Sequence, residues 1–182
     1  MTFRLSLLAL LCALPAQAAG DYYKDNVGDL KFNEPALQCM DISSVKVSST
    51  DRKTFTFEVK TKAPINAAAD NPPYFIVAVN SDGDLSTGTS AWTTGQDFCA
   101  FINLAGASVK DTRTTGDANA ISAVSIEDNT LRFTLTFDAN KQKRITFNVR
   151  SMIRRQSQDG KVPYTVLDSS VPANERYHEF KL

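Results

Sequence analysis

Two aspartates and two cysteines have matched positions in the chain, and the two aspartates could hold a cation between them. Cys39 lies two residues before Asp41, and Asp97 lies two residues before Cys99. In an antiparallel strand pair, opposed residues have a constant sum of residue numbers, so if the cysteines face each other, the aspartates do so too. Like charges opposed across a sheet are unfavourable unless a positive group joins them. The spacing predicts a cation or an arginine between Asp41 and Asp97. The alternative is a disulfide between two sheets, with the aspartates capping turns.

A second candidate calcium site is Asn80-Ser-Asp82-Gly-Asp84, where oxygen-bearing side chains recur at alternate positions. Hard oxygen ligands at this spacing suit calcium. The segment is not an EF-hand, because Leu85 and Ala91 stand where that motif has its glycine and its bidentate glutamate. Asp and Gly also satisfy backbone geometry in tight turns, so a plain turn is the alternative.

Aromatic and histidine side chains offer two further kinds of site. Trp92 is the one tryptophan and lies in the polar stretch 90–95, where its ring could stack on a sugar or fold back over the end of the domain. His178 is the one histidine. A Ser-His-Asp or Cys-His mechanism would need this one histidine, and no nucleophile elbow, phosphate-binding loop or HExxH motif is present. These residues predict a binding protein rather than an enzyme.

Residues 1–18 are typical of a cleaved export signal. Arg4 supplies the positive start, the apolar run that follows is too short to cross a bilayer, and Ala16-Gln-Ala18 is an A-x-A cleavage site. We therefore expect one mature domain, residues 19–182, in the periplasm or outside the cell.

Composition limits the partners of this mature domain. The formal net charge of the full chain is +0, removal of Arg4 with the signal leaves the mature domain near −1, and no basic stripe is visible, which argues against nucleic acid. No second apolar stretch is long enough to insert in a membrane. Because an exported domain meets oxidising conditions, Cys39 and Cys99 are expected to form a disulfide. Closing a loop of about 60 residues would contribute about 4 kcal/mol. Two separate buried thiols are the alternative.

Alternation of apolar and polar residues with a period of two dominates the mature chain. It predicts half-buried strands at 54–60, 131–137 and 145–150. Residues 73–80 are continuously apolar, which predicts a central strand covered on both faces. Polar breaks at Asp51-Arg52 and Asp128-Asn129 predict hairpins over 42–60 and 120–137. Further strands are predicted at 42–49, 97–105, 120–127 and 175–181, with 161–167 as an additional candidate. Eight or nine short strands without a helical period indicate an antiparallel sandwich or barrel.

Four segments occur in an order that matches a known family. They are Asp25-Asn-Val-Gly-Asp29, Met40-Asp-Ile-Ser-Ser-Val45, the stretch 74–88 ending in Thr87-Gly88, and Gly95-Gln-Asp-Phe98. In this order they resemble the motifs of extracellular β-sandwich modules called DOMON-like or carbohydrate-binding-module-family-9-like domains. A later segment, Asp168-Ser-Ser-Val-Pro172, resembles the family's closing motif. Asn80 departs from the pattern, which has aspartate there, and 173–175 lack its polar-glycine turn.

The resemblance implies a jelly-roll-like β-sandwich and a ligand-binding, non-catalytic role. With Trp92 in a loop, we predict an exported module that binds a carbohydrate or another small ligand, with calcium as the cofactor that the acidic residues would hold. The alternatives are a periplasmic or cell-surface domain that engages a protein partner, a haem-binding electron-transfer domain, and a hydrolase with a carboxylate pair. The haem alternative is implied by the resemblance, because some domains of this superfamily bind haem through Met and His or Lys side chains. His178, Met40 and Met152 would be the available ligands of the first two types, although ordinary packing explains all three.

Overall fold

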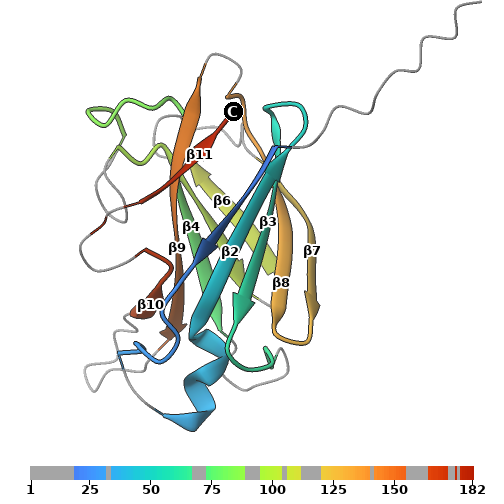
Figure 1. The fold of residues 1–182 in the computed structure, drawn as a ribbon, viewed down its shortest axis with the longest axis vertical. Helices are drawn as coiled ribbons and strands as arrows, with labels where there is room; N and C mark the ends of the chain where they lie inside the picture. Colours follow the sequence, from blue (N-terminus) through green and yellow to red (C-terminus); the bar gives the residue numbers. More distant parts are fainter. Residues whose placement is uncertain are drawn as a thin grey trace, which may run out of the picture.

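Eleven strands and one short 3₁₀ helix form the part of the chain that the computed structural model describes. The strands form two antiparallel sheets that pack face to face, and the first sheet lies in front of the second in Figure 1. The predicted all-β sandwich is confirmed. The predicted signal peptide, residues 1–18, lies outside the described residues. These are 19–31, 34–66, 73–88, 95–103, 106–111, 120–139, 142–154, 164–171, 175 and 177–182.

The first sheet has the strand order β1-β2-β3-β8-β7. Its strands are β1 (Ala19–Lys24), β2 (Ile42–Ser49), β3 (Thr54–Thr61), β8 (Thr130–Thr136) and β7 (Ala120–Glu127). Both predicted hairpins are present, because β2 pairs with β3 and β7 pairs with β8 in antiparallel register. Arg52 and Asp128 lie in their turns with φ of 57° and 53°, as tight hairpin turns require.

The second sheet has the order β10-β9-β4-β5-β6, and β11 also pairs with β9. Its strands are β10 (Tyr164–Ser169), β9 (Arg144–Arg154), β4 (Tyr74–Asn80), β5 (Phe98–Asn103), β6 (Gly106–Asp111) and β11 (His178–Lys181). The apolar run at 73–80 becomes β4, the middle strand, in which every residue after Tyr74 is buried. Its prediction as a central strand is confirmed.

The core lies between the two sheets and is built by the alternating residues. Phe57 of β3 stacks on Phe133 of β8, with ring centroids 5.3 Å apart. It also meets Phe147 of β9 edge to face at 5.5 Å, which joins the two sheets. Aromatic pairs in these geometries contribute about 0.5–1.5 kcal/mol beyond their burial.

Three elements differ from the sequence prediction. The strand β1 was not predicted, and it pairs along its whole length with β2. The strand predicted over 97–105 is present as β5, but its hairpin partner β6 was not predicted. The 3₁₀ helix η1 (Pro35–Met40) was also not predicted. Each is six residues long, which is too short for a repeating pattern to stand out in the sequence.

The predicted Cys39–Cys99 disulfide is wrong, because neither cysteine forms a disulfide. Cys39 is in η1 and not on a strand. Cys99 is in β5, opposite Ala78 and Lys110. Its thiol is buried in a small apolar cluster with Ile76, on the face of the second sheet that points away from the main core. The two cysteines therefore never meet across a strand pair.

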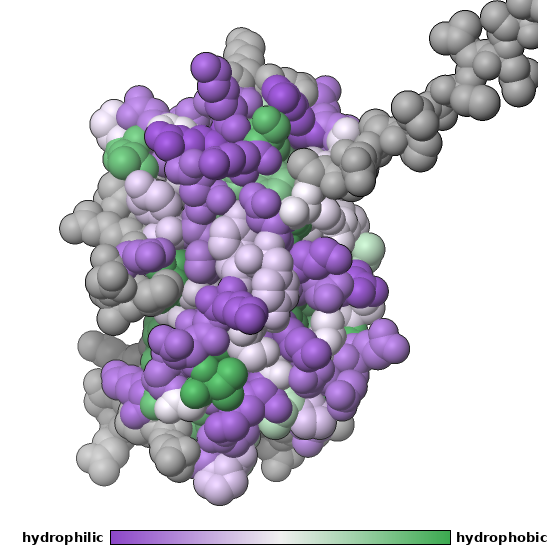
Figure 2. Space-filling model, viewed as in Figure 1, coloured by the Kyte–Doolittle hydropathy of each residue, from purple (hydrophilic) through white to green (hydrophobic). Residues whose placement is uncertain are grey.

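The outer face of the first sheet is mostly hydrophilic. Figure 2 shows polar colours over most of this face where it is not grey, and the hydrophobic areas are small and separate. Arg132 and Glu58 form an ion pair there at 2.7 Å. This face does not present the continuous apolar surface that a large protein interface would use.

Candidate cation site

The structure places Asp41 and Asp97 at opposite ends of the sandwich. The residue before Asp41 accepts a hydrogen bond of 2.6 Å from Ser151 Oγ on β9. Asp97 accepts a hydrogen bond of 2.6 Å from the N–H of Ser81. Ser81 follows Asn80, the last residue of β4, which pairs with Thr146 of β9. Ser151 and Thr146 are about 17 Å apart at 3.4 Å per strand residue. The structure therefore does not bring the two aspartates together, since the index-sum argument assumed a strand pairing that does not exist.

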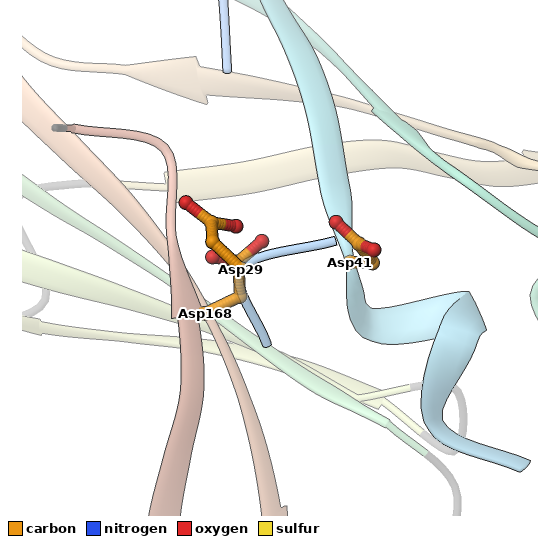
Figure 3. Close-up of side chains that lie close together, drawn as sticks. All are labelled: Asp29, Asp41 and Asp168. Atoms are coloured by element: carbon orange, nitrogen blue, oxygen red, sulfur yellow. The ribbon is translucent and has the colours of Figure 1, made fainter. Parts of the chain in front are cut away.

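Asp41 meets other carboxylates instead. Asp29, Asp41 and Asp168 each offer an oxygen, and these oxygens all lie within 4.8 Å of one another. Figure 3 shows how they converge from the loop after β1, the start of β2 and β10. Asp41 is 0% exposed and Asp168 is 6% exposed, whereas Asp29 is exposed.

Asp25 is a fourth carboxylate close enough to interact with this group. Burial raises the pKa of Asp25 to about 7, and the charges of Asp29 and Asp41 act in the same direction. Its Oδ2 is buried and has no hydrogen-bond partner among the described residues. We refer to Asp25, Asp29, Asp41 and Asp168 as the acid cluster.

The two oxygens of Asp41 have different surroundings. Oδ2 accepts a hydrogen bond of 2.8 Å from the N–H of Gly28 and lies 3.6 Å from Lys62 Nζ. The lysine side chain is 42% exposed, so water screens the pair and it offsets little of the burial cost. Oδ1 is buried and has no hydrogen-bond partner in the described part of the chain. Burial raises the pKa of Asp41.

Asp168 is held in place by backbone donors. Its Oδ2 accepts a hydrogen bond of 2.6 Å from the N–H of Ile42, and its Oδ1 accepts one of 2.7 Å from Ser169. Burial raises the pKa of Asp168 to about 8, with further contributions from the charges of Asp25 and Asp29. The ionised forms of these carboxyl groups are therefore disfavoured unless a cation lies beside them.

In the turn after β4, side-chain oxygens accept hydrogen bonds from the turn itself. Asn80 Oδ1 accepts a hydrogen bond of 2.7 Å from Gly83, and Asp82 Oδ1 accepts one of 2.9 Å from Asp84. Asp84 Oδ1 accepts hydrogen bonds from the N–H and hydroxyl of Ser86 at 2.8 and 2.6 Å. These contacts are typical of the plain turn that was the alternative to a calcium site.

Asp97 closes the same turn. Its Oδ2 accepts hydrogen bonds from the N–H and hydroxyl of Ser81 and from the N–H of Asp82, at 2.6, 2.8 and 3.1 Å. This carboxylate therefore links the start of β5 to the end of β4.

The remaining predicted site residues are dispersed or undescribed. Trp92 lies outside the described residues, so its expected role stays a prediction. His178 is on β11 opposite Phe147, and Met152 lies farther along β9, opposite Tyr74. Met40 is in η1, in another cluster. The structure does not gather the predicted haem ligands.

His178 contacts interior groups. Its Nε2 is 3.1 Å from Ser170 Oγ, and its ring centroid is 4.5 Å from that of Tyr23. Burial lowers the pKa of His178. This histidine is therefore part of the packing between β1 and β11.

Sequence reasoning found one cluster member, Asp41, and missed the others as ligands. Asp25, Asp29 and Asp168 were recognised only as ends of motif-like segments. The signal that would have found them is that each such segment begins or ends in an aspartate.

Comparisons with known proteins show a similar fold. No family model and no curated protein matches the chain. The chain is similar to a family 9 carbohydrate-binding module from Caldicellulosiruptor kristjanssonii, solved in complex with cellotriose. The TM-score is 0.52 at 9% identity, over 88% of this chain and 81% of that one.

At this identity the comparison shows a family-9-like fold and does not test the DOMON-like part of the resemblance. Among the described residues, no helix is long and apolar enough to cross a membrane.

Proposed function

We propose that this protein is an exported, non-enzymatic module that binds a carbohydrate, and that its acid cluster holds a calcium ion that assists binding. The observation that carries the proposal is Asp41 Oδ1, a fully buried carboxylate oxygen with no hydrogen-bond partner among the described residues. It lies among further carboxylates, where a proton or a metal ion is the balancing group.

The geometry of the cluster suits calcium. Calcium binds oxygen at about 2.3–2.6 Å, so two oxygens on one ion lie at most about 5 Å apart. Oxygens from Asp29, Asp41 and Asp168 lie within 4.8 Å of one another. Calcium takes 6 to 8 oxygen ligands in flexible geometry, and no nitrogen or sulfur ligand contributes to this cluster.

The raised pKa values support the same assignment. Burial raises the pKa of Asp25 to about 7 and that of Asp168 to about 8. Perturbed carboxyl groups that share one site are typical of functional positions. A bound cation would displace protons from these groups and replace their mutual repulsion by attraction.

The carbohydrate part of the proposal rests on the shared fold. The similar module was solved with cellotriose, and its fold matches 88% of this chain. A rigid sandwich presents its loops as a binding surface, and the sequence predicts that the polar stretch with Trp92 is such a loop.

A glycan array tests this proposal on the mature chain, residues 19–182, after circular dichroism has confirmed folding. In millimolar calcium we expect a reproducible class of glycans to bind. A blank array with folded protein would overturn the carbohydrate part and direct the search to a protein partner.

Repeating the array in chelator tests the assisting ion. We expect the same glycans to bind more weakly in chelator, and also more weakly to Asp41→Asn in calcium. Equal binding in calcium and in chelator would overturn the assisting role of the ion.

A further inference from the structure

A cavity of about 260 Å³ opens beside the acid cluster and shares two of its carboxylates. Its wall combines acidic, basic, hydroxyl and apolar side chains: Asp29, Lys31, Val166, Leu167, Asp168, Ser169 and Val171. Pockets for drug-sized ligands span about 300–1,000 Å³, so this one suits a small group such as one sugar ring.

The cation site and the cavity share a boundary. Asp41 and Asp168 are buried, and the backbone N–H groups of Gly28 and Ile42 each fix one of their oxygens. Asp29 is exposed and lies on the cavity wall. Because calcium takes 6 to 8 ligands, the three converging carboxylates, even with Asp25 as a fourth, leave at least two positions open when each binds through one oxygen. Asp29 and Asp168 belong both to the cation site and to the cavity wall, so a group in the cavity lies next to the ion.

We propose that this cavity is the sugar subsite, in which two adjacent hydroxyls of one ring bind the calcium ion directly. This inference rests on the proposed function and specifies where the ligand binds and through which atoms. The ion then contacts the ligand itself.

Charge and shape favour a neutral sugar. The four carboxylates are balanced by one calcium ion together with Lys31 on the cavity wall and Lys62 beside Asp41. With no surplus positive charge, neutral hydroxyls fit better than an anionic group. Of the apolar side chains on the wall, Val166 is partly exposed and offers surface to the C–H face of a ring, whereas Leu167 and Val171 are buried beneath it.

Terbium luminescence measures the open positions, because Tb³⁺ replaces calcium and its lifetimes in H₂O and D₂O count bound waters. We expect at least about two waters on the ion in the mature protein, in keeping with the open positions of the site. The sugar probes are cellotriose and the methyl glycosides of glucose, galactose, mannose and fucose. At least one of them should lower the water count.

A substitution that fills the cavity tests sugar binding independently of ion binding. Val166→Trp should retain terbium binding and weaken the sugar that binds wild type by roughly tenfold or more, because the new ring occupies the cavity. The matched control is Val124→Trp on β7, where the valine is 39% exposed and lies on the other sheet. It should bind both terbium and sugar as wild type does.

The outcomes distinguish this inference from the proposed function. If terbium does not bind, the calcium site itself is overturned. If terbium binds but no probe changes its water count, the direct contact is overturned while the calcium site stands. If Val166→Trp binds the sugar like wild type, the sugar binds elsewhere on a functional module, and the cavity assignment is overturned.

Discussion

At the scale of single residues, Asp41 is the carboxylate on which the proposed cation site depends most. It is 0% exposed, and one of its oxygens is bonded to Gly28 while the other has no hydrogen-bond partner among the described residues. An unsatisfied buried carboxylate is costly, so its presence indicates a compensating group. Removing the charge therefore has opposite effects with and without the ion.

The substitution Asp41→Asn tests this reversal. Without calcium, the variant should be at least as stable as wild type, because it removes one charge from a repelling group. With calcium at 100 times its dissociation constant, wild type should gain about 2.7 kcal/mol, or roughly 5–10 °C in melting temperature. The variant should lose that gain. Thermal melts in calcium and in chelator measure both effects.

The matched control for this prediction is Asp84→Asn. Asp84 is an exposed carboxylate in the turn after β4, where its Oδ1 accepts hydrogen bonds from Ser86. It should keep the full calcium response. A calcium response in Asp41→Asn equal to that of wild type would show that the ion does not bind at the acid cluster.

The two cysteines give a second prediction at this scale. Cys39 is partly exposed, whereas Cys99 is 2% exposed. An alkylating reagent without reductant should therefore label Cys39 in the native protein and Cys99 only after unfolding. Mass spectrometry counts the labels. A denatured, unreduced protein that takes up no label would show that the cysteines are paired after all.

At the scale of elements, the turn after β4 depends on a glycine. Gly95 has φ of +68°, and a Cβ there would lie 2.6 Å from both Asn80 Nδ2 and Asp84 O. Gly95→Ala should therefore destabilise the protein by about 2–4 kcal/mol, from left-handed strain together with the clash.

Gly83 provides the control for Gly95. It has φ of +70°, but a Cβ there would meet nothing nearer than Gln142 Oε1 at 3.6 Å. Gly83→Ala should cost only about 1–2 kcal/mol, the strain alone. Urea denaturation of the two variants compares the costs, and equal costs would mean that the contact with Asn80 and Asp84 does not constrain the turn.

At the scale of the whole molecule, stability should depend on pH in a direction that calcium changes. The folded pKa values of Asp25 and Asp168 are about 7 and about 8, above the unfolded value of about 3.9. Between about pH 4 and pH 8, the folded state without calcium therefore binds more protons than the unfolded state. Its free energy of unfolding should fall as pH rises through this window.

Calcium competes with those protons, so the stabilisation that it gives should be larger at pH 8 than at pH 5.5. Denaturation at both pH values, with calcium and with chelator, measures the four free energies. A calcium effect that does not change with pH would mean that the ion does not displace protons from these carboxyl groups.

Local pattern was enough to predict most of the sheet elements. In β3, Phe55, Phe57 and Val59 alternate with polar residues, and all three are buried in the core. The hairpins β2–β3 and β7–β8 followed from short polar breaks. The helix η1 was missed because its six residues carry no periodic signal, and the pairing of Cys99 was missed because local pattern does not identify a strand's neighbours.

The sequence by itself determined which residues form strands and which faces are buried, because the two-residue period of a strand is a local property. Only the tertiary structure decided that Asp25, Asp29, Asp41 and Asp168 meet. The N–H of Ile42 bonds to Asp168, 126 residues away, and this contact brings the start of β2 to β10. Such contacts depend on sheet order and loop path, and the packing of two sheets fixes both. The acid cluster is therefore a consequence of topology, assembled from aspartates that are unremarkable in the linear chain.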